Sequence, residues 1–223
     1  MRRLINDIRM IVLISIYKND NASHLRLSID SILHQTYSDF RILIGVDGYV
    51  DALLAETLKS YEQDNRIKVF WFKENRGLTA VLNELLEEGK KLNPSYIARM
   101  DADDISRPNR FEKQVRYLEE HPDLDVLGGA IEEMDYDGKL NGKVIHYPLN
   151  HQQCFDFFAT RNPLAHPAVM FRTSFFDRVS SYNGIGHSRL DVSLVISVML
   201  CLRSVYLRIC INVEGGQGLL LKC

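Results

Sequence analysis

The sequence predicts an α/β fold with a mostly parallel sheet and helices on both of its faces. Apolar segments of strand length alternate with helical segments over the first 130 residues, and polar residues follow where several of these strands end. Strands that are separated by helices favour parallel pairing, because each crossover helix covers one face of the sheet. Ligands of such sheets bind beyond the carboxyl ends of the strands.

Apolar runs of four to eight residues predict the four strands of this sheet. They are residues 10–17, 40–46, 67–72 and 96–100. Apolar residues at helical spacing predict the helices that follow them. These are residues 21–33, 51–61, 78–92 and 108–118. Asn21 or Ser23 is the expected cap of the first helix, and Pro108 suits the first turn of the last.

The second half of the chain has a less regular pattern. We expect strands over residues 126–133 and 166–172, and a short helix over residues 152–159. The composition changes from Gly184 onward. The last 40 residues hold only two of the 29 acidic residues and three of the four cysteines, without clear caps or periodicity.

Length and composition bound the class of protein. The 223 residues suffice for one sizeable domain, and a net charge of −2 without a basic stripe indicates no nucleic-acid partner. The four cysteines lack metal-ligand spacing, which favours a reducing cytoplasm. The basic N-terminus is too charged for a signal peptide, and the longest apolar run, 192–202, is too short to span a bilayer. We expect a cytoplasmic protein, and peripheral membrane association stays open.

Three carboxylates follow the fourth strand within four residues: Asp101, Asp103 and Asp104. Because a strand alternates its side chains with period two, Asp101 and Asp103 are expected on the same side. Two close carboxylates favour a hard cation such as Mg²⁺ or Mn²⁺, whose remaining positions are filled by substrate phosphate and water. The run therefore predicts a metal–phosphate site. Surface-loop carboxylates or a cap for the next helix are the alternatives.

Other polar residues at strand ends have a structural and a functional interpretation. Tyr17 is either a buried aromatic or a platform for a nucleobase. Asp47 forms a turn with Gly48 or accepts a hydrogen bond from a base N–H. Arg76 belongs to a turn before a helix or contacts a nucleotide. His166 is interpreted as a structural histidine.

Taken in order, these segments resemble the inverting family 2 glycosyltransferases, which have the GT-A fold. The run 31–40 (SILHQTYSDF) is similar to a distinctive string of that family, and Val46 replaces the first Asp of its Asp-Asp-Gly turn. The resemblance covers about residues 10–183 and leans toward the subgroup that builds bacterial capsule, exopolysaccharide and O-antigen chains. The other matching segments are 14–19, 75–78 with Asn83, 100–104 followed by Pro108, Arg110, Phe111 and Gln114, and 166–172.

The resemblance implies a hexosyltransferase-type enzyme that transfers a sugar from a nucleotide-diphospho-sugar, expected to be a UDP-sugar, to a glycan or lipid-linked acceptor with inversion. Tyr17 would stack on uracil and Asp47 would accept from the base. Asp101 and Asp103 would hold Mn²⁺ or Mg²⁺ bridging the diphosphate. The implied nucleotide-binding residues are Ser15, Tyr17, Asp47, Arg76 and Asp101.

The resemblance also divides the chain and exposes a departure. Residues 1–183 would form the GT-A domain, with a donor half (1–130) and the start of an acceptor half (131–183). The family's general base is an Asp about 25 residues after the His-Pro pair, which gives Asp191 here, without its usual Glu, Asp and Trp neighbours. We hypothesise that residues 184–223 are a frameshifted or diverged tail. The alternative coding frames across codons 180–195 test this.

Two other functions stay open at the level of the sequence. If the acceptor half is impaired, the chain would be a nucleotide-sugar-binding relic without transfer activity. A dehalogenase-type phosphatase also carries an Asp-x-Asp after a strand, although there the pair normally follows the first strand. Release of phosphate without a sugar acceptor would favour the phosphatase.

Overall fold

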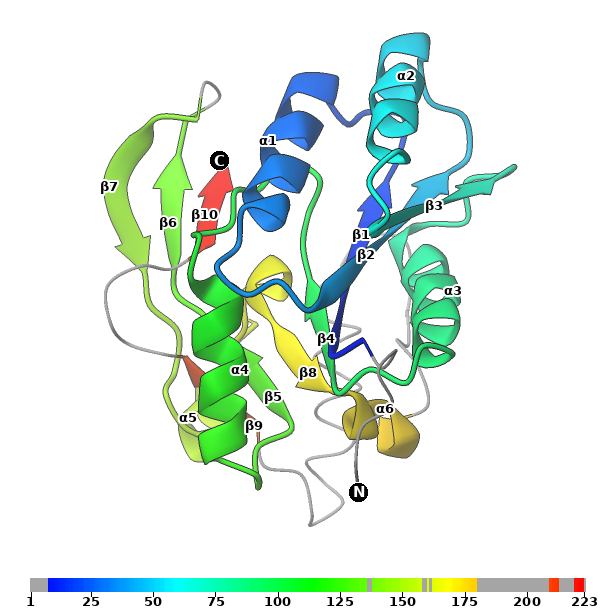
Figure 1. The fold of residues 1–223 in the computed structure, drawn as a ribbon. Coiled ribbons are helices and arrows are strands. Elements are labelled where there is room, and N and C mark those ends of the chain that lie inside the picture. The colour runs from blue at the N-terminus through cyan, green and yellow to red at the C-terminus, as the bar shows by residue number, and fades with distance from the viewer. Residues whose placement is uncertain are drawn as a thin grey trace.

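The computed structural model describes residues 8–135, 138–157, 160, 162–179, 209–212 and 219–222. Its central sheet has the strand order β3-β2-β1-β4-β8-β5-β9, and a second sheet has the order β10-β6-β7 (Figure 1). The first four strands pair in parallel, as predicted. They are β1 (Met10–Ile16), β2 (Phe40–Asp47), β3 (Ile67–Phe72) and β4 (Tyr96–Arg99).

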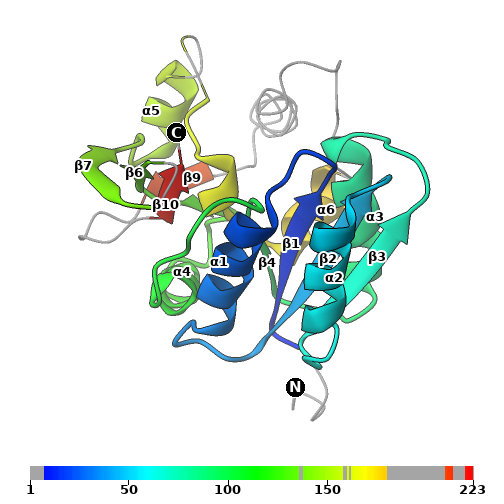
Figure 2. The ribbon, with the colours of Figure 1, turned by 90° about the horizontal axis from the view of Figure 1, so that it is seen from above.

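Helices cover both faces of this sheet, and strand β1 shows why. Its even-numbered residues, Met10 to Ile16, pack in one core with α1, α2 and α4, whereas Ile11 and Leu13 pack in the other core with α3 and α6. Figure 2 shows the two helical layers on opposite sides of β1 and β2. The bounds are α1 (Ala22–Leu33), α2 (Ala52–Tyr61), α3 (Leu78–Lys90), α4 (Arg110–Glu120) and α6 (Thr173–Val179).

Local chemistry explains where the first helices begin. The side chain of Asn21 accepts from the backbone N–H of Ser23 at 2.8 Å, so Asn21 is the cap of α1. Asp51 caps α2 in the same way, accepting from the N–H of Leu54 at 2.8 Å. The predicted helix from Pro108 begins two residues later, at Arg110.

The structure corrects three predicted strands. Strand β4 ends at Arg99, one residue early, so the carboxylates after it lie in a turn. The segment 126–133 divides into β5 (Val126–Gly128) and β6 (Ile131–Met134), which join different sheets. The segment 166–172 begins as the 3-10 turn η1 (His166–Ala168), because Pro167 cannot donate to a ladder; it continues as β8 (Met170–Arg172), antiparallel to β4 and β5.

The remaining elements lie beside β5 and β6. They are β7 (Leu140–Ile145), α5 (His151–Phe157), β9 (Ile209–Asn212) and β10 (Leu219–Lys222). β9 and β10 come from the predicted tail, and they pair with β5 and β6. The predicted helix 152–159 begins one residue early, and residues 158–159 lie outside the described part. The division of the chain at residue 183 stays a prediction.

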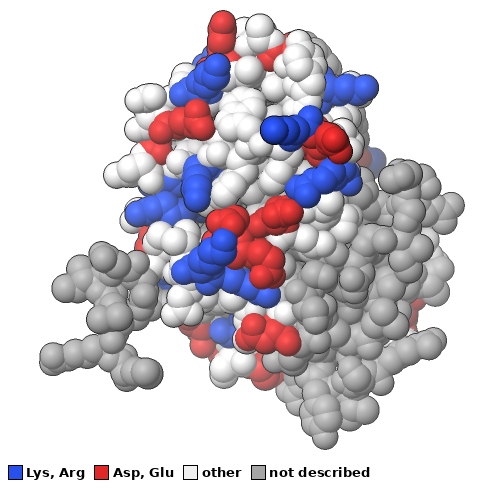
Figure 3. All heavy atoms as spheres, turned by 90° about the vertical axis from the view of Figure 1, so that its right-hand side faces the viewer, with Lys and Arg blue, Asp and Glu red and all other residues white. Residues whose placement is uncertain are grey.

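Acidic and basic side chains are intermixed on the face that carries α3 (Figure 3). Three ion pairs on this helix segment join opposite charges: Arg76–Glu84, Lys90–Glu87 and Lys91–Glu88. A face of mixed sign does not present a single-sign field to a charged partner. In the part of the chain that the structure describes, no helix is both long and apolar enough to cross a membrane.

Candidate donor site

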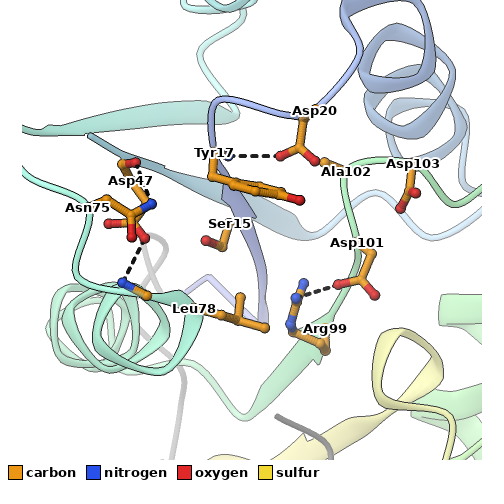
Figure 4. Close-up of a pocket in the computed structure, with 11 residues that line it drawn as sticks. Ser15, Tyr17, Asp20, Asp47, Asn75, Leu78, Arg99, Asp101, Ala102 and Asp103 are labelled. Carbon is orange, nitrogen blue, oxygen red and sulfur yellow. Dashed lines mark hydrogen bonds and ion pairs between the residues drawn. The ribbon is translucent and has the colours of Figure 1, made fainter. Parts of the chain in front are cut away.

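A pocket of about 430 Å³ opens where β1, β2 and β4 end, at the carboxyl edge of the parallel strands (Figure 4). It brings together five of the residues that the sequence predicted: Ser15, Tyr17, Asp47, Asp101 and Asp103. The other lining residues are Asp20, Asn75, Gly77, Leu78, Arg99 and Ala102. The side chains that were predicted to lie together at the strand ends therefore do line one cavity.

Asp47, at the end of β2, holds two loops together. It is 3% exposed, and its two carboxylate oxygens accept from the backbone N–H groups of Arg76 at 2.7 Å and Gly77 at 2.8 Å. Gly48 follows with φ +82°, and a Cβ there would lie 2.8 Å from the backbone N of Asn75. The predicted turn is therefore confirmed. Each carboxylate oxygen keeps a second lone pair, so acceptance from a base stays a prediction.

The side chain of Arg76 points away from the pocket lining. Its guanidinium pairs with Glu84 at 3.1 Å and lies 4.7 Å from the centroid of the Phe72 ring. The backbone N–H of Arg76 donates to the pocket residue Asp47. Nucleotide binding by Arg76 stays a prediction.

The pocket has two rims, the end of β2 at Asp47 and the segment after β4 with Asp101 and Asp103. Tyr17 and Asp20 line the pocket between them (Figure 4). The predicted buried aromatic is wrong, because Tyr17 follows the last residue of β1 and is 43% exposed. An exposed ring is suited to stacking on a planar group. The Tyr17 N–H donates to the Asp20 carboxylate at 2.8 Å. Burial, together with the negative charges of Asp103 and Asp101, raises the pKa of Asp20 to about 6.

Asp101 and Asp103 occupy the opposite rim. They lie in a turn, so their shared orientation toward the pocket comes from the turn and not from strand alternation. The Asp103 side chain is exposed, and Asp101 is 36% exposed. Below them Arg99, 1% exposed, donates to the Asp101 carboxylate and to the carbonyl of Leu13, the latter at 3.2 Å.

Polar side chains on helix α1 and just after its end, which we call the α1 stripe, hold this turn in place. Ser28 donates to the backbone carbonyl of Asp101 at 2.8 Å, and Ser31 accepts from the N–H of Ser106 at 2.9 Å. Gln35 donates to the carbonyl of Arg107 at 2.7 Å and accepts from the N–H of Phe111 at 3.1 Å. These residues belong to or adjoin the SILHQT run, which therefore positions the carboxylate segment.

Helix α4 fastens the other side of the same segment. Arg110 donates to the carbonyl of Arg99 at 3.0 Å and to Gln114 at 3.0 Å, and Gln114 donates to the carbonyl of Ala168 at 2.8 Å. Burial lowers the pKa of Arg110 to about 9. The two side chains tie the end of β4 to the turn that contains His166.

His166 is a buried histidine, 8% exposed. Burial, together with the nearby positive charge of Arg99, lowers its pKa to about 3. A neutral imidazole at physiological pH agrees with the structural interpretation.

Arg99 and Asp20 are pocket residues to which sequence reasoning gave no role. The signal for Arg99 was a charged residue inside an otherwise apolar strand, where a side chain this buried needs a specific partner. Asp20 carried no comparable signal, because an aspartate after a strand is ordinary turn chemistry.

The carboxylates of Asp101 and Asp103 fit a divalent cation. Among the described residues no group of three or more His, Cys, Asp or Glu side chains is arranged to hold a metal. Mg²⁺ and Mn²⁺ sites next to phosphate need only one or two carboxylates, because substrate and water supply the rest. The pair faces a cavity in which a phosphate could supply those ligands. Asp191, the predicted base, lies outside the described residues.

Comparisons with known proteins identify the family of this chain. Residues 11–179 match the sequence model of glycosyl transferase family 2. The chain is 34% identical over 189 residues to the O-antigen biosynthesis glycosyltransferase WbnJ of Escherichia coli, covering 84% of this chain and 70% of the relative. It is 33% identical to the amylovoran biosynthesis glycosyltransferase AmsE of Erwinia amylovora, covering 79% of this chain and 63% of the relative.

The name of a further relative gives both its donor and its lipid-linked acceptor. It is the UDP-Gal:alpha-D-GlcNAc-diphosphoundecaprenol beta-1,3-galactosyltransferase of Escherichia coli, 30% identical over 77% of this chain and 61% of the relative. The chain thus spans less than two thirds of the length of two of these three relatives.

Two solved structures share the fold. S. aureus TarS 1–349 in complex with UDP has a TM-score of 0.70 at 14% identity, covering 96% of this chain and 60% of that chain. The mannosyltransferase PcManGT of Pyrobaculum calidifontis, in complex with GDP-Man and Mn²⁺, has a TM-score of 0.66 at 12% identity, covering 96% and 56%. The predicted GT-A-like α/β fold is thereby confirmed. With three quarters of its length matched by the family's sequence model, the chain belongs to glycosyl transferase family 2.

Proposed function

We propose that this chain transfers a sugar from a UDP-sugar to a glycan or lipid-linked acceptor, with inversion, in the synthesis of a cell-surface polysaccharide. The observation that carries the proposal is the pocket at the strand ends. It joins an exposed aromatic ring, Tyr17, to a pair of carboxylates, Asp101 and Asp103, across one cavity. A nucleoside diphosphate has the matching parts: a planar base at one end and a metal-binding diphosphate at the other.

The base end of the donor would lie between Tyr17 and the loop at Asp47. Tyr17 offers a ring face for stacking, and Asp47 offers the remaining lone pairs of two oxygens that backbone amides already orient. The UDP and UDP-GlcNAc complexes of TarS, which shares the fold, support a uridine nucleotide as the ligand here.

The diphosphate end would lie at Asp101 and Asp103, which would hold Mn²⁺ or Mg²⁺. A divalent ion there supplies charge neutralisation for the diphosphate as it leaves the sugar. The residues of this chain contribute the orientation: Ser28 fixes the backbone at Asp101, and the α1 stripe fixes the rest of the turn. The Mn²⁺ complex of PcManGT supports this assignment.

The acceptor side of the reaction needs a base for the attacking hydroxyl, and our prediction for it is Asp191. Attack on the side opposite to the leaving diphosphate inverts the anomeric centre. The named relatives act in O-antigen and amylovoran synthesis and on a diphosphoundecaprenol substrate, which supports a glycan or lipid-linked acceptor. Such work would take place in the cytoplasm at the inner face of the cell membrane.

The first experiment measures UDP binding by calorimetry with and without Mn²⁺. We expect UDP to bind more tightly with Mn²⁺, and we expect Asp103→Ala to weaken this binding and Glu88→Ala to leave it intact, because Glu88 is a surface carboxylate paired with Lys91 on α3. Absence of UDP binding by the folded wild-type chain would contradict the proposal.

The second experiment offers a panel of UDP-sugars with undecaprenyl-diphosphate-linked acceptors and follows the anomeric configuration of the product by NMR. Transfer with inversion that Asp191→Ala removes supports the enzyme. Binding without transfer indicates a nucleotide-sugar-binding relic. Release of phosphate without any acceptor would instead support the phosphatase alternative.

A further inference from the structure

A buried cation lies directly under the acidic rim of the pocket. The Arg99 side chain is 1% exposed and lines the cavity (Figure 4). One terminal nitrogen donates to the carbonyl of Leu13 at 3.2 Å and the other to the Asp101 carboxylate. Its Nε is buried without a hydrogen-bond partner among the described residues. A buried guanidinium with this much unused donor capacity is unusual, because buried charges need full pairing.

Three carboxylates, those of Asp20, Asp101 and Asp103, line the cavity together with the Arg99 guanidinium. The charges of Asp101, Asp103 and Arg99 act on the pKa of Asp20, and all four residues line the cavity. Asp101 is the ion-pair partner of Arg99. If Asp101 turned wholly to a metal ion, Arg99 would lose its ion-pair partner, and a buried charge without a close partner is strongly unfavourable. A second anion in the pocket removes this conflict, and a diphosphate is such an anion.

We propose that Arg99 is a diphosphate-binding residue of the donor site and also the counter-ion that keeps the empty carboxylate pair a weak metal site. The metal and the diphosphate would then bind together: the diphosphate takes over Arg99 while the metal takes over Asp101. This inference rests on the proposed function, because it assumes a nucleoside diphosphate as the ligand.

Arg99 should act with opposite sign on the two ligands. Its positive charge repels a divalent cation placed at Asp101 and attracts a diphosphate placed above it. Loss of the charge should therefore tighten the metal alone and weaken the nucleotide alone. A residue that only supports the fold of the turn would weaken both.

The test uses Arg99→Met, which keeps the length of the apolar stem and removes the charge. Mn²⁺ binding in the absence of nucleotide is followed by EPR of the free ion, and UDP binding in the presence of EDTA is followed by calorimetry. We expect Mn²⁺ to bind at least about threefold tighter. We expect UDP to bind about tenfold weaker, the size of one charge-assisted hydrogen bond. Arg66→Met, which removes an arginine paired with Asp64 outside the pocket, should change neither.

The outcomes separate the two proposals. If wild type does not bind UDP with or without Mn²⁺, the proposed function fails. If wild type binds UDP but Arg99→Met weakens both ligands or leaves UDP unchanged, the role of Arg99 is overturned. Should Arg99→Met not fold, Arg99→Lys keeps the charge but loses the guanidinium fork that spans Leu13 and Asp101. Arg99→Lys should leave Mn²⁺ affinity within about twofold, because the positive charge remains. It should weaken UDP binding severalfold, because the guanidinium fork is lost. Weaker binding of both ligands would again overturn the inference.

Discussion

The two rims of the donor pocket use aspartate in opposite ways. At the end of β2, the Asp47 carboxylate is 3% exposed and accepts two backbone N–H groups, so the side chain orders the main chain. After β4, the main chain is ordered by other side chains, Ser28 and Gln35 among them. The Asp101 and Asp103 carboxylates there face the cavity.

This difference separates a carboxylate that builds the site from carboxylates that remain for a ligand. Backbone N–H groups that lose their partners in a partly buried loop reduce stability, so we expect Asp47 to be needed even in the empty pocket. The exposed Asp103 side chain makes no hydrogen bond or ion pair with the described residues, so we expect folding not to depend on it. We therefore expect isosteric Asn substitutions on the two rims to give opposite phenotypes.

Asp103→Asn should give the largest effect on binding and almost none on stability. We expect Mn²⁺-dependent UDP affinity to fall by about 100-fold or more, because even residues that only support a metal ligand cost 10–100-fold. Calorimetry with Mn²⁺ measures the affinity, and a thermal melt without metal should show no loss of stability. A lower melting temperature would place Asp103 with Asp47 as a structural residue.

Asp47→Asn should give the converse result. The Asn side chain can accept only one of the two N–H groups at Arg76 and Gly77, and its own NH₂ would face the other donor. We expect a loss of about 2 kcal/mol in the free energy of unfolding. Urea denaturation measures it. Unchanged stability with weaker UDP binding would show that the carboxylate serves the ligand and not the loop.

The same comparison shows what could be predicted from the sequence. The carboxyl ends of parallel strands lie at one edge of a sheet. The predicted strands therefore indicated that Tyr17, Asp47 and Asp101 would lie close together, and all three line one cavity. The period-two argument for Asp101 and Asp103 was wrong in its reason, because the strand ends at Arg99. Such an end depends on hydrogen bonds to distant segments.

Long-range polar contacts are the part that one sequence does not predict. Ser28 and Asp101 are 73 positions apart, and Gln35 and Phe111 are 76 apart. Serine and glutamine side chains are mostly exposed in proteins, so their residue types alone do not select these partners. The family resemblance marked the run around Gln35 as distinctive, and the structure supplies the physical reason.

Gln35→Leu should destabilise the rim after β4, whose backbone is held by side chains from other segments. The substitution leaves the N–H of Phe111 and the carbonyl of Arg107 without this partner while keeping the side-chain volume. We expect a loss of about 1–2 kcal/mol in unfolding free energy and weaker Mn²⁺-dependent UDP binding by about tenfold. Gln152→Leu on the exposed face of α5 is the matched control. Loss of stability with unchanged UDP affinity would limit the stripe to folding.

Asp20 should give the smallest effect and the sharpest test, because it shares features of both rims. It accepts the Tyr17 N–H, as Asp47 does for its loop, but faces the charges of Asp101 and Asp103. Its pKa is raised to about 6, so its protonated form stabilises the folded state at low pH, and this contribution is lost as pH rises through about 6. Asp20→Asn keeps an acceptor for Tyr17 without the charge. In EDTA we expect it to match wild type near pH 4 and to exceed it by about 1 kcal/mol at pH 8, after allowance for partial exposure. Thermal melts across this range measure the difference. Lower stability of Asp20→Asn than of wild type at pH 8 would mean that the ionised Asp20 carboxylate stabilises the backbone at Tyr17, as Asp47 does for its own loop.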